Sequence, residues 1–391
     1  MPRKYLETHP WISFSVDTQQ AEIAIWLLLG EAQSKCEHVA GALLDPQTAD
    51  ALHAVYLAKG ALATTAIEGN TLTEAQVQLH LEGKLELPKS KEYLKNEIDN
   101  VIKACNTIAG EHLRGEKPPL STDEIRRYNA FVLGDIPKED DVMPGEIRRH
   151  NVSVGRYRGA PVEDCLYLLD RLCNMLEGDF SLGNAWPIAS GILKAILAHL
   201  YIAWIHPFGD GNGRTARLVE FGLCISAGVP TPAAHLLSNH YNETRTAYYS
   251  ALEQTSKRKT PFPFIAYALQ GYVDQLGEQI AKIRQVQYRA FWTHYVHMQF
   301  QKRDGVAHKR RRDLVLDLSE KTFGNAEWIA TSDLAALSAR LRAMYHGMTP
   351  KAISRDVNAL VTMGLLRHAR GKVRPRFELV EAYLPSQVKR E

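Results

Sequence analysis

The sequence has few cysteines and few long apolar runs. Its five cysteines are scattered over 391 residues, and none belongs to a CxxC pair of the kind that binds zinc or carries redox chemistry. The segment Met1–Thr18 is polar and interrupted by Pro2 and Pro10, so it lacks the apolar core of a secretory signal. No later apolar run is expected to reach the length of a membrane span. We therefore expect a cytoplasmic protein with no membrane partner.

Charge is unevenly divided along the chain. The composition, 45% hydrophobic and 23% charged, is that of a globular protein, and the length favours two or three domains. Residues 301–391 hold 18 Lys and Arg against 10 Asp and Glu, a net charge of +8, which leaves −5 of the overall +3 for residues 1–300. Only the C-terminal part is therefore a candidate to bind a polyanion.

The first 300 residues are mostly helical by pattern. Apolar residues recur every three or four positions, and Ser121 or Thr122 ahead of Glu124 is typical of a helix N-cap. One segment differs, Gly145–Val162, where valines alternate with polar residues as in a β-hairpin. The sequence predicts a mainly α domain with one hairpin. The expected helices are Ala21–Glu37, Asp50–Ile67, Glu92–His112, Pro187–Ile205 and Ala216–Ser226.

The C-terminal part is similar to a winged helix. Three helices are expected before two short strands, with Thr349 capping the third helix and Pro350 in its first turn. The buried stripe of that helix is expected to hold Ile353, Val357, Leu360 and Val361. The expected helices are Arg312–Ser319, Ser332–Arg342 and Pro350–Met363, and the expected strands are Leu365–His368 and Arg376–Val380, flanking the basic turn Arg370–Pro375.

Two functions are open for this winged-helix-like part. Lys351, Ser354, Arg355 and Asn358 lie on the expected outer side of its third helix, as a helix that reads a DNA groove requires. Winged helices also serve as protein-contact modules, and the cluster Lys309–Arg312 fits a solvated face equally well. DNA is accordingly one expected partner, and a protein partner is the alternative.

One loop carries the groups that phosphate chemistry needs. An apolar helix runs into His206, and Pro207 is expected to hold that histidine in an extended conformation. Gly211-Asn212-Gly213 then opens the next helix, where backbone N–H groups can bind an anion. Asp210 at the mouth of the turn suits a Mg²⁺ ion between the carboxylate and phosphates. Arg214 and Arg217 share one helix face and can both reach phosphate oxygens.

These groups favour phosphoryl or nucleotidyl transfer. Such chemistry depends on positioning and charge neutralisation, and His206 would take the proton of the attacking hydroxyl. The glycines lack the Lys-Ser/Thr pair of a Walker loop. His199, on the apolar helix before the loop, is expected to pack in the core instead of binding a ligand.

The same residues resemble a known family. The stretch His206-Pro-Phe-Gly-Asp-Gly-Asn-Gly-Arg-Thr-Ala-Arg217 resembles the signature of the Fic (filamentation induced by cAMP) family, His-Pro-Phe-x-Asp/Glu-Gly-Asn-Gly-Arg-x-x-Arg. Thr64–Asn70 resembles the family's inhibitory motif, Ser/Thr-x-x-x-Glu-Gly/Asn, through Thr64, Glu68 and Gly69. Gly145–Gly155 is similar to the flap hairpin that aligns the target side chain, and Arg245–Leu252 is similar to the stretch whose tyrosines line the adenine pocket.

The resemblance, which covers roughly residues 20–285, implies an activity and a role for each residue. His206 would be the general base and Asp210 the Mg²⁺ ligand, with ATP as substrate and a Tyr, Thr or Ser hydroxyl of an unnamed target protein as acceptor of AMP. The glycine at 213 argues against the Doc subgroup, which has lysine there and phosphorylates its target. Glu68 would inhibit the enzyme by pairing with Arg217. The nucleotide-binding residues implied are Asp210, Gly211, Asn212, Gly213, Arg214, Thr215, Arg217, Val154, Gly155, Arg156, Tyr157, Tyr248 and Tyr249.

The sequence also predicts a domain organisation and leaves two alternative functions open. We expect a helical region with the inhibitory motif at residues 1–115, a Fic catalytic domain at 116–290 and a winged-helix-like domain at 305–391. A homodimer is compatible with this plan. Removal of AMP from a modified protein, and DNA-binding regulation with a Fic domain that only senses nucleotide, are the alternative functions.

Overall fold

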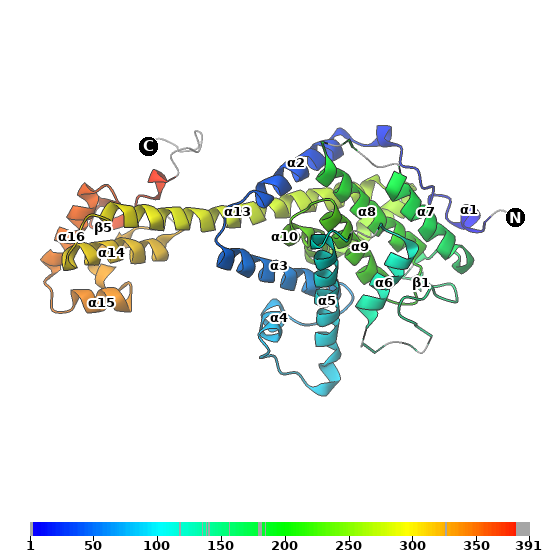
Figure 1. Cartoon of the computed structure of the whole chain (residues 1–391), viewed down its shortest axis with the longest axis horizontal. Helices are drawn as coiled ribbons and strands as arrows, with labels where there is room; N and C mark the ends of the chain where they lie inside the picture. Colours follow the sequence, from blue (N-terminus) through cyan, green and yellow to red (C-terminus); the bar gives the residue numbers. More distant parts are fainter. Residues whose placement is uncertain are drawn as a thin grey trace. The chain divides into compact units, whose positions relative to one another are not determined.

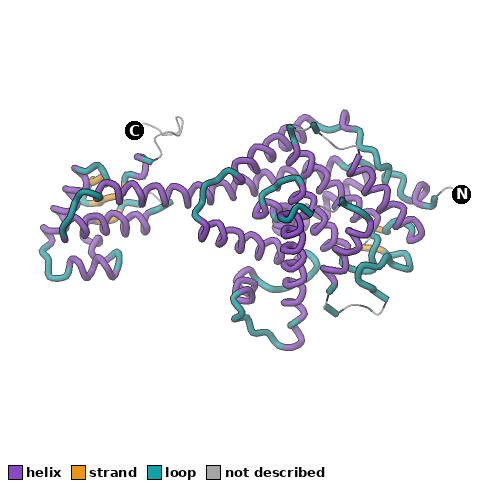
Figure 2. The backbone as a smooth tube through the Cα atoms, viewed as in Figure 1, coloured by secondary structure: helices purple, strands orange, loops and turns teal. Residues whose placement is uncertain are grey.

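The computed structural model describes residues 3–380 apart from 117–118, 135, 138, 140, 156, 179–181, 184 and 325–326. The chain divides into two compact units, Met1–Ile280 and Ala281–Glu391. In the described part, helices dominate both units and strands are short (Figure 2). The mainly α fold class predicted from the sequence is thus confirmed. The finer domain boundaries expected at residues 115, 290 and 305 stay predictions.

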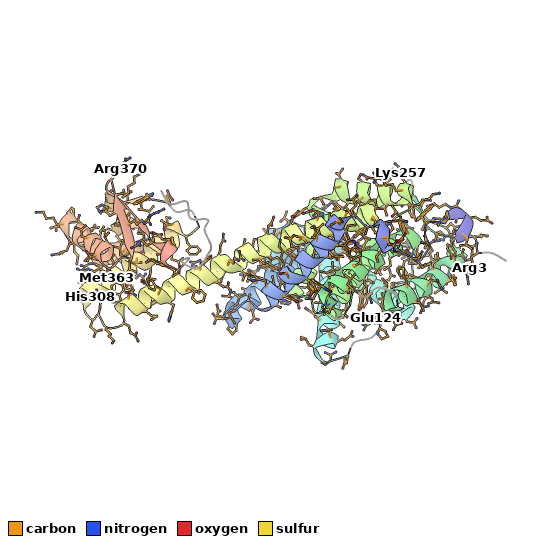
Figure 3. All side chains as sticks on the ribbon, turned by 90° about the horizontal axis from the view of Figure 1, so that it is seen from above. Arg3, Glu124, Lys257, His308, Met363 and Arg370 are labelled. Atoms are coloured by element: carbon orange, nitrogen blue, oxygen red, sulfur yellow. The ribbon has the colours of Figure 1, made fainter. Side chains whose placement is uncertain are left out.

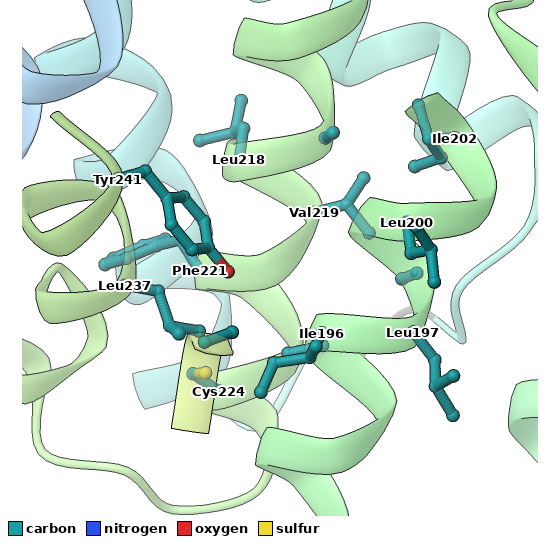
Figure 4. Close-up of a cluster of buried hydrophobic side chains, with 14 of the residues drawn as sticks. Ile196, Leu197, Leu200, Ile202, Leu218, Val219, Phe221, Cys224, Leu237 and Tyr241 are labelled. Atoms are coloured by element: carbon teal, nitrogen blue, oxygen red, sulfur yellow. The ribbon is translucent and has the colours of Figure 1, made fainter. Parts of the chain in front are cut away.

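Two antiparallel neighbours, α8 (Pro187–Ile205) and α9 (Asn212–Ser226), form the centre of the first unit. Figure 4 shows Ile196 and Leu200 from α8 beside Val219 from α9 in this core. Because α8 is apolar on every side, it can be covered on every side. The expectation that no run reaches membrane-span length is wrong for α8, which is long and apolar enough, but 89% of it is buried inside the unit, as in a core helix.

The remaining helices of the first unit surround this pair (Figure 1). Ser121 caps α6 by accepting a hydrogen bond from the backbone N–H of Glu124, which confirms the predicted N-cap. The helix α3 lies against α9 and α11, and a Cβ at Gly60 would fall 2.3 Å from Nδ1 of His235, so glycine permits this close approach. The other helices are α1 (Tyr5–Thr8), α2 (Ile23–Ala40), α3 (Pro46–Ala66), α4 (Glu74–Leu81), α5 (Tyr93–Leu113), α6 (Thr122–Leu133), α7 (Cys165–Gly178), α10 (Thr231–Ala234), α11 (Leu236–Glu243), α12 (Arg245–Arg258) and the first part of α13 (Phe262–Phe300).

The predicted hairpin is present and short. Strands β1 (Ser153–Val154) and β2 (Tyr157–Arg158) pair antiparallel, with Val154 opposite Tyr157. Upstream of β1, Ile147 forms an antiparallel bridge with Phe208. The segment that leads into the hairpin is therefore attached by its backbone to the loop after α8.

The second unit has its own core, to which the end of α13 contributes Trp292, Val296 and Phe300. Three antiparallel strands form a sheet in the order β3-β5-β4. The chain order of helix, strand, two helices and a β-hairpin is that of a winged helix. The elements are α14 (Val306–Thr322), β3 (Ile329–Ala330), α15 (Ala339–Tyr345), α16 (Pro350–Thr362), β4 (Leu366–Ala369) and β5 (Lys372–Pro375).

Several details of the second unit differ from the sequence prediction. The second hairpin strand is Lys372–Pro375, which had been assigned to the turn, because Arg370 and Gly371 alone make the reversal, both with positive φ. Thr349 is at the N-cap of α16 but its side chain makes no capping bond. Val361, which was expected in the buried stripe, is exposed. Asp356 is buried on that side of the helix instead. The segment expected to be one helix at Ser332–Arg342 is a 3₁₀ turn followed by α15, which Ser338 caps.

The basic cluster Lys309–Arg312 is partly internal. The carboxylate of Asp356, fully buried, accepts hydrogen bonds from Nε of Arg310 at 2.7 Å and Nε of Arg311 at 2.8 Å. The hydroxyl of Tyr345 donates to the same carboxylate at 3.1 Å. Two of the four basic residues expected on a solvated face thus hold α14 to α16, since a buried carboxylate requires such partners.

Candidate active site

His206 ends α8 in the left-handed conformation, with φ 51° and ψ 60°. The extended conformation expected from Pro207 is wrong. A following proline disfavours the right-handed helix but leaves the left-handed region open, and there the N–H of His206 still reaches the carbonyl oxygen of Ile202 at 2.8 Å. The chain thereby turns sharply out of the core helix, and the imidazole lies at the helix end.

Arg148 fixes this turn from the segment before the hairpin. Its buried guanidinium donates from Nε to the carbonyl oxygen of His206 at 2.8 Å and from Nη1 to that of His150 at 2.7 Å. Its Nη2 donates to the carbonyl oxygen of Ala160. One side chain therefore joins the helix end to both sides of the β1–β2 hairpin.

The imidazole of His206 is held neutral. Burial lowers its pKa to about 4, with a further lowering by Arg148, while a hydrogen bond to the backbone of Ala203 and the carboxylates of Glu68 and Asp210 oppose this shift. A histidine with such a pKa is unprotonated at neutral pH. It can therefore accept a proton from a nearby hydroxyl.

The start of α9 has the geometry of an anion site. Gly211 is its N-cap with φ 75°, so the first N–H groups of the helix point out of its end, as the sequence predicts. The side chain of Asn212 serves the loop itself: its amide oxygen accepts from the N–H of Phe208 at 2.9 Å, and its amide nitrogen donates to the carbonyl oxygen of Phe208 at 2.8 Å. Only the backbone of Asn212 is then open to a ligand.

Glu68 reaches this anion site from just beyond the end of α3. Its Oε1 lies 2.6 Å from Nη2 of Arg217, whose side chain is 1% exposed and which also donates to the carbonyl oxygen of Thr64 at 2.9 Å. A Cβ built on Gly213 would fall 2.2 Å from the same Oε1. Burial raises the pKa of Glu68, but Arg217 outweighs burial and holds that pKa below its usual range. An ionised carboxylate thus lies directly against the helix N-terminus.

A second ion-pair group surrounds Arg214. Its Nη1 lies 3.2 Å from Oε1 of Glu97, and its Nη2 lies 3.1 Å from Oδ2 of Asp210. Glu97 also accepts from the amide of Asn70 at 2.8 Å, which joins the end of the Thr64–Asn70 segment to α5. Burial raises the pKa of Glu97. The site therefore contains three carboxylates against two guanidinium groups.

Tyr157 and Thr215, both expected to bind the nucleotide, have structural hydrogen bonds instead. The hydroxyl of Tyr157 donates to the carbonyl oxygen of Trp204 at 2.7 Å, which anchors the hairpin on α8. Thr215 is fully buried and accepts from the amide of Asn129 at 3.1 Å. Gly155 is exposed with φ 55° at the hairpin turn. Arg156 and the side chain of Val154 lie outside the described residues.

The two tyrosines of α12 lie differently. Tyr248 is buried and its hydroxyl is 2.9 Å from Nε2 of His199, whereas Tyr249 is 51% exposed. His199 is in the core, as expected, but in a polar network, because its Nδ1 lies 2.9 Å from Oε2 of the buried Glu220. Tyr249 is therefore the tyrosine with surface available for a ligand.

Sequence reasoning missed Asn129, Arg148 and Glu97. Asn129 donates to the carbonyl oxygen of Asp210 at 3.0 Å and accepts from the N–H of Gly145 at 2.9 Å, so it links the loop to the hairpin segment. A signal existed for Glu97: an acidic residue next to Ile98 on the buried face of an amphipathic helix. Arg148 belongs to the segment that resembles the flap, where no role had been assigned to it.

Known proteins share this architecture. Residues 119–222 match the Fic/DOC family. It is 31% identical over 204 residues to protein adenylyltransferase fic-1 of Caenorhabditis briggsae, and 32% identical over 206 residues to the protein of that name in Caenorhabditis elegans. Each match covers 52% of this chain and 37% of the relative, so the chain spans little more than a third of the length of these relatives.

Solved structures agree on the fold. A Fic family protein from Desulfovibrio desulfuricans G20 is similar over 90% of this chain and 96% of its own, with a TM-score of 0.54 and 18% identity. Fic-1 from Caenorhabditis elegans is similar over 66% of this chain and 73% of its own, with a TM-score of 0.53 and 25% identity. The first likeness concerns the fold alone.

Proposed function

We propose that this protein is an adenylyltransferase that moves AMP from ATP to a Tyr, Thr or Ser hydroxyl of another protein. The observation that carries the proposal is the placement of a neutral His206 beside the N-terminus of α9, with Arg214 and Arg217 on the same helix. Relatives named protein adenylyltransferase, about 31% identical over half of the chain, support the same activity.

The reaction needs a base and an anion site. The hydroxyl oxygen of the target attacks the α-phosphorus of ATP while His206 accepts the hydroxyl proton. The bond from the α-phosphorus to the bridging oxygen breaks, and pyrophosphate leaves with its charge held by the backbone of residues 211–213 and by the two arginines. Nη1 of Arg217 is buried without a hydrogen-bond partner in the described part of the chain, and it lies 3.1 Å from the position of a Cβ on Gly213. This donor is available to a phosphate oxygen.

Asp210 is the residue that would hold a magnesium ion in this site. The Asp210 carboxylate is 46% exposed at the loop mouth. The described residues contain no cluster of three acidic, histidine or cysteine side chains able to hold a metal alone. That fits Mg²⁺, which protein sites often hold through one or two carboxylates, substrate phosphates and water. When bound, Mg²⁺ would neutralise charge on the phosphates, which three nearby carboxylates would otherwise repel.

The Glu68 to Arg217 ion pair supports an autoinhibited resting state. Glu68 occupies the space beside Gly213 and engages the guanidinium of Arg217. By the family resemblance, this guanidinium would hold the γ phosphate of ATP. ATP could bind only in a pose shifted from this arrangement, and a shift of about an ångström can cost on the order of 100-fold in rate.

Free thiols at all five cysteines support our placement of the protein in the reducing cytoplasm.

The test compares two positions of the label on ATP. The Glu68→Gly protein is incubated with a lysate of its own cells and either α-labelled or γ-labelled ATP, and His206→Ala in the same background is the matched control. We expect protein bands with α label alone, absent in the control. Label from γ-labelled ATP would show phosphorylation instead, and loss of α label from isolated AMP-bearing protein on adding wild type without ATP would favour AMP removal.

A further inference from the structure

We propose that the second unit binds duplex DNA through a face formed by α16 and the β4–β5 hairpin, called here the α16 face. Its occupant is the double helix, with α16 in the major groove and the hairpin against the phosphate backbone. This proposal is independent of the AMP transfer proposed for the first unit.

The first support is the connection between the helices. Residues 346–349 join α15 to α16 and include Gly347 with φ 71°. A helix, a turn of three or four residues that often contains glycine, and a second helix make a helix-turn-helix, whose second helix enters the major groove in DNA-binding proteins. The sheet order β3-β5-β4 then places a hairpin directly after that second helix.

The two sides of α16 differ in chemistry. Its inner side buries Ala352, Asp356, Val357 and Leu360. The exposed residues are Pro350, Lys351, Ser354, Arg355, Asn358, Val361 and Thr362. These include two cations and an amide, the side-chain types that contact phosphates and base edges, and no acid. A helix that docks on a protein usually presents an apolar stripe, whereas among the described residues of α16 the one exposed large hydrophobic side chain is Val361, at 37%.

The α16 face has a positive charge, and the single acidic residue of residues 350–376 is buried. Residues 350–376 hold seven Lys and Arg and a single acidic residue, Asp356. That carboxylate is fully buried and is paired with Arg310 and Arg311, which come from α14. The negative charge of Asp356 therefore does not offset the positive charge of the α16 face. The two arginines that neutralise Asp356 lie outside residues 350–376.

Five cations of this stretch are exposed, and we consider the four that are not paired with Glu378, namely Lys351, Arg355, Arg370 and Lys372. In the described part of the chain none of the four takes part in an ion pair; Arg367 and Arg376 pair with Glu378, and Arg374 lies over the ring of Trp328. Such a set suits a polyanion with regularly spaced phosphates.

The tip of the hairpin adds a strained arginine. Arg370 has φ 48°, in the region that Gly or Asn adopts most readily, and it occupies the first position of the two-residue turn Arg370-Gly371. Figure 3 shows Arg370 at the outer edge of this unit. Strained residues of this kind concentrate at functional sites, and here the strain places a guanidinium at the most projecting point of the hairpin.

The test uses the full chain and a fluorescent 30-base-pair duplex of random sequence, with binding measured by anisotropy at increasing NaCl. Four phosphate contacts predict a slope of log K against log salt of about −3 to −4. Lys351→Ala with Arg355→Ala should weaken binding by roughly 10- to 100-fold and reduce the slope by about 2, and Arg370→Asn, which keeps the left-handed turn, should reduce it by about 1.

The matched control is Arg303→Ala with Lys321→Ala, which removes two exposed cations of the same unit outside the α16 face. We expect it to change affinity less than twofold, and circular dichroism checks that every variant is folded. Absence of binding by the wild type at 50 mM NaCl would overturn the proposal and leave a protein-contact module. Equal weakening by the control and the α16-face variants would overturn it too, because binding would then depend on net charge alone.

Discussion

The guanidinium of Arg148 donates a hydrogen bond of 2.8 Å to the carbonyl oxygen of His206. The bond joins a residue of the hairpin segment to the proposed base across 58 positions of sequence. Because the carbonyl belongs to a residue in the left-handed conformation, the contact fixes both the turn out of α8 and the direction of the imidazole.

Arg148→Ala should therefore lower kcat for AMP transfer in the Glu68→Gly background on the order of 100-fold, since the base would lose its position by about an ångström. Arg148 does not touch the nucleotide in this arrangement, so KM for ATP should change little. Arg148→Lys, which keeps the positive charge but has a single donor nitrogen in place of three, should recover part of kcat. Exposed Arg114 provides the control, and an Arg114→Ala protein as slow as Arg148→Ala would contradict a specific positioning role.

His206→Ala should abolish AMP transfer and keep ATP binding, because the imidazole is proposed to move a proton and not to hold phosphate. Calorimetric titration with ATP measures the second property and α-label incorporation the first. Self-labelling as strong as in the parent protein would remove His206 from the role of general base.

Glu68→Gly should raise self-labelling by roughly 100-fold, because Arg217 becomes free to hold the γ phosphate and ATP takes its productive pose. Adding Arg217→Ala should cancel most of the gain. The three proteins are compared side by side with α-labelled ATP. If wild type and Glu68→Gly label equally, Glu68 is a structural partner of Arg217 without regulatory effect.

The protonation of His206 can be followed directly by NMR, with His206→Gln to assign its signals. Burial and Arg148 lower its pKa to about 4, so the ring should remain neutral down to about pH 5. The unfolded chain, with a pKa near 6.5, binds the proton first, so His206 makes the protein progressively less stable as pH falls from about 6.5 toward 4. A midpoint near 6.5 in the folded protein would contradict the buried environment.

Asp356→Ala should destabilise the second unit by about 3–5 kcal/mol, because Arg310 and Arg311 lose the carboxylate that neutralises them. Hydrogen exchange over residues 306–375 measures the effect locally in the full chain. Asp333, which is exposed, is the control. If protection from hydrogen exchange falls no further in Asp356→Ala than in Asp333→Ala, the buried carboxylate contributes nothing measurable to the stability of the second unit.

How far the sequence predicts the site depends on how local its parts are. His206, Asp210, Gly211 and Arg217 lie within twelve residues, so spacing alone brings them to one loop and helix end. Their supports are not local: Glu97 meets Arg214 across 117 positions and Asn129 meets Asp210 across 81. A single sequence contains no pairing signal at such separations, which is why these residues were missed.

Helices were predicted better than turns for a similar reason. The bounds of α8 follow from Pro187 and Pro207 and agree to the residue. The hairpin of the second unit was misplaced because Arg370 is not a residue type that indicates positive φ. His206 was predicted to be extended because Pro207 leaves both the extended and the left-handed regions open, and the sequence alone does not choose between them.

Gly213 restricts how this protein can change under mutation. The room left by its missing side chain accommodates the Glu68 carboxylate, and the same room faces the N-terminus of α9 where a phosphate would sit. A side chain at 213 would meet the Glu68 carboxylate first, because its Cβ would lie 2.2 Å from Oε1 of Glu68 and 3.1 Å from Nη1 of Arg217. The observed contact between Glu68 and Arg217 therefore depends on glycine at 213, so evolution can remove this contact either at Glu68 or at the position that accommodates it.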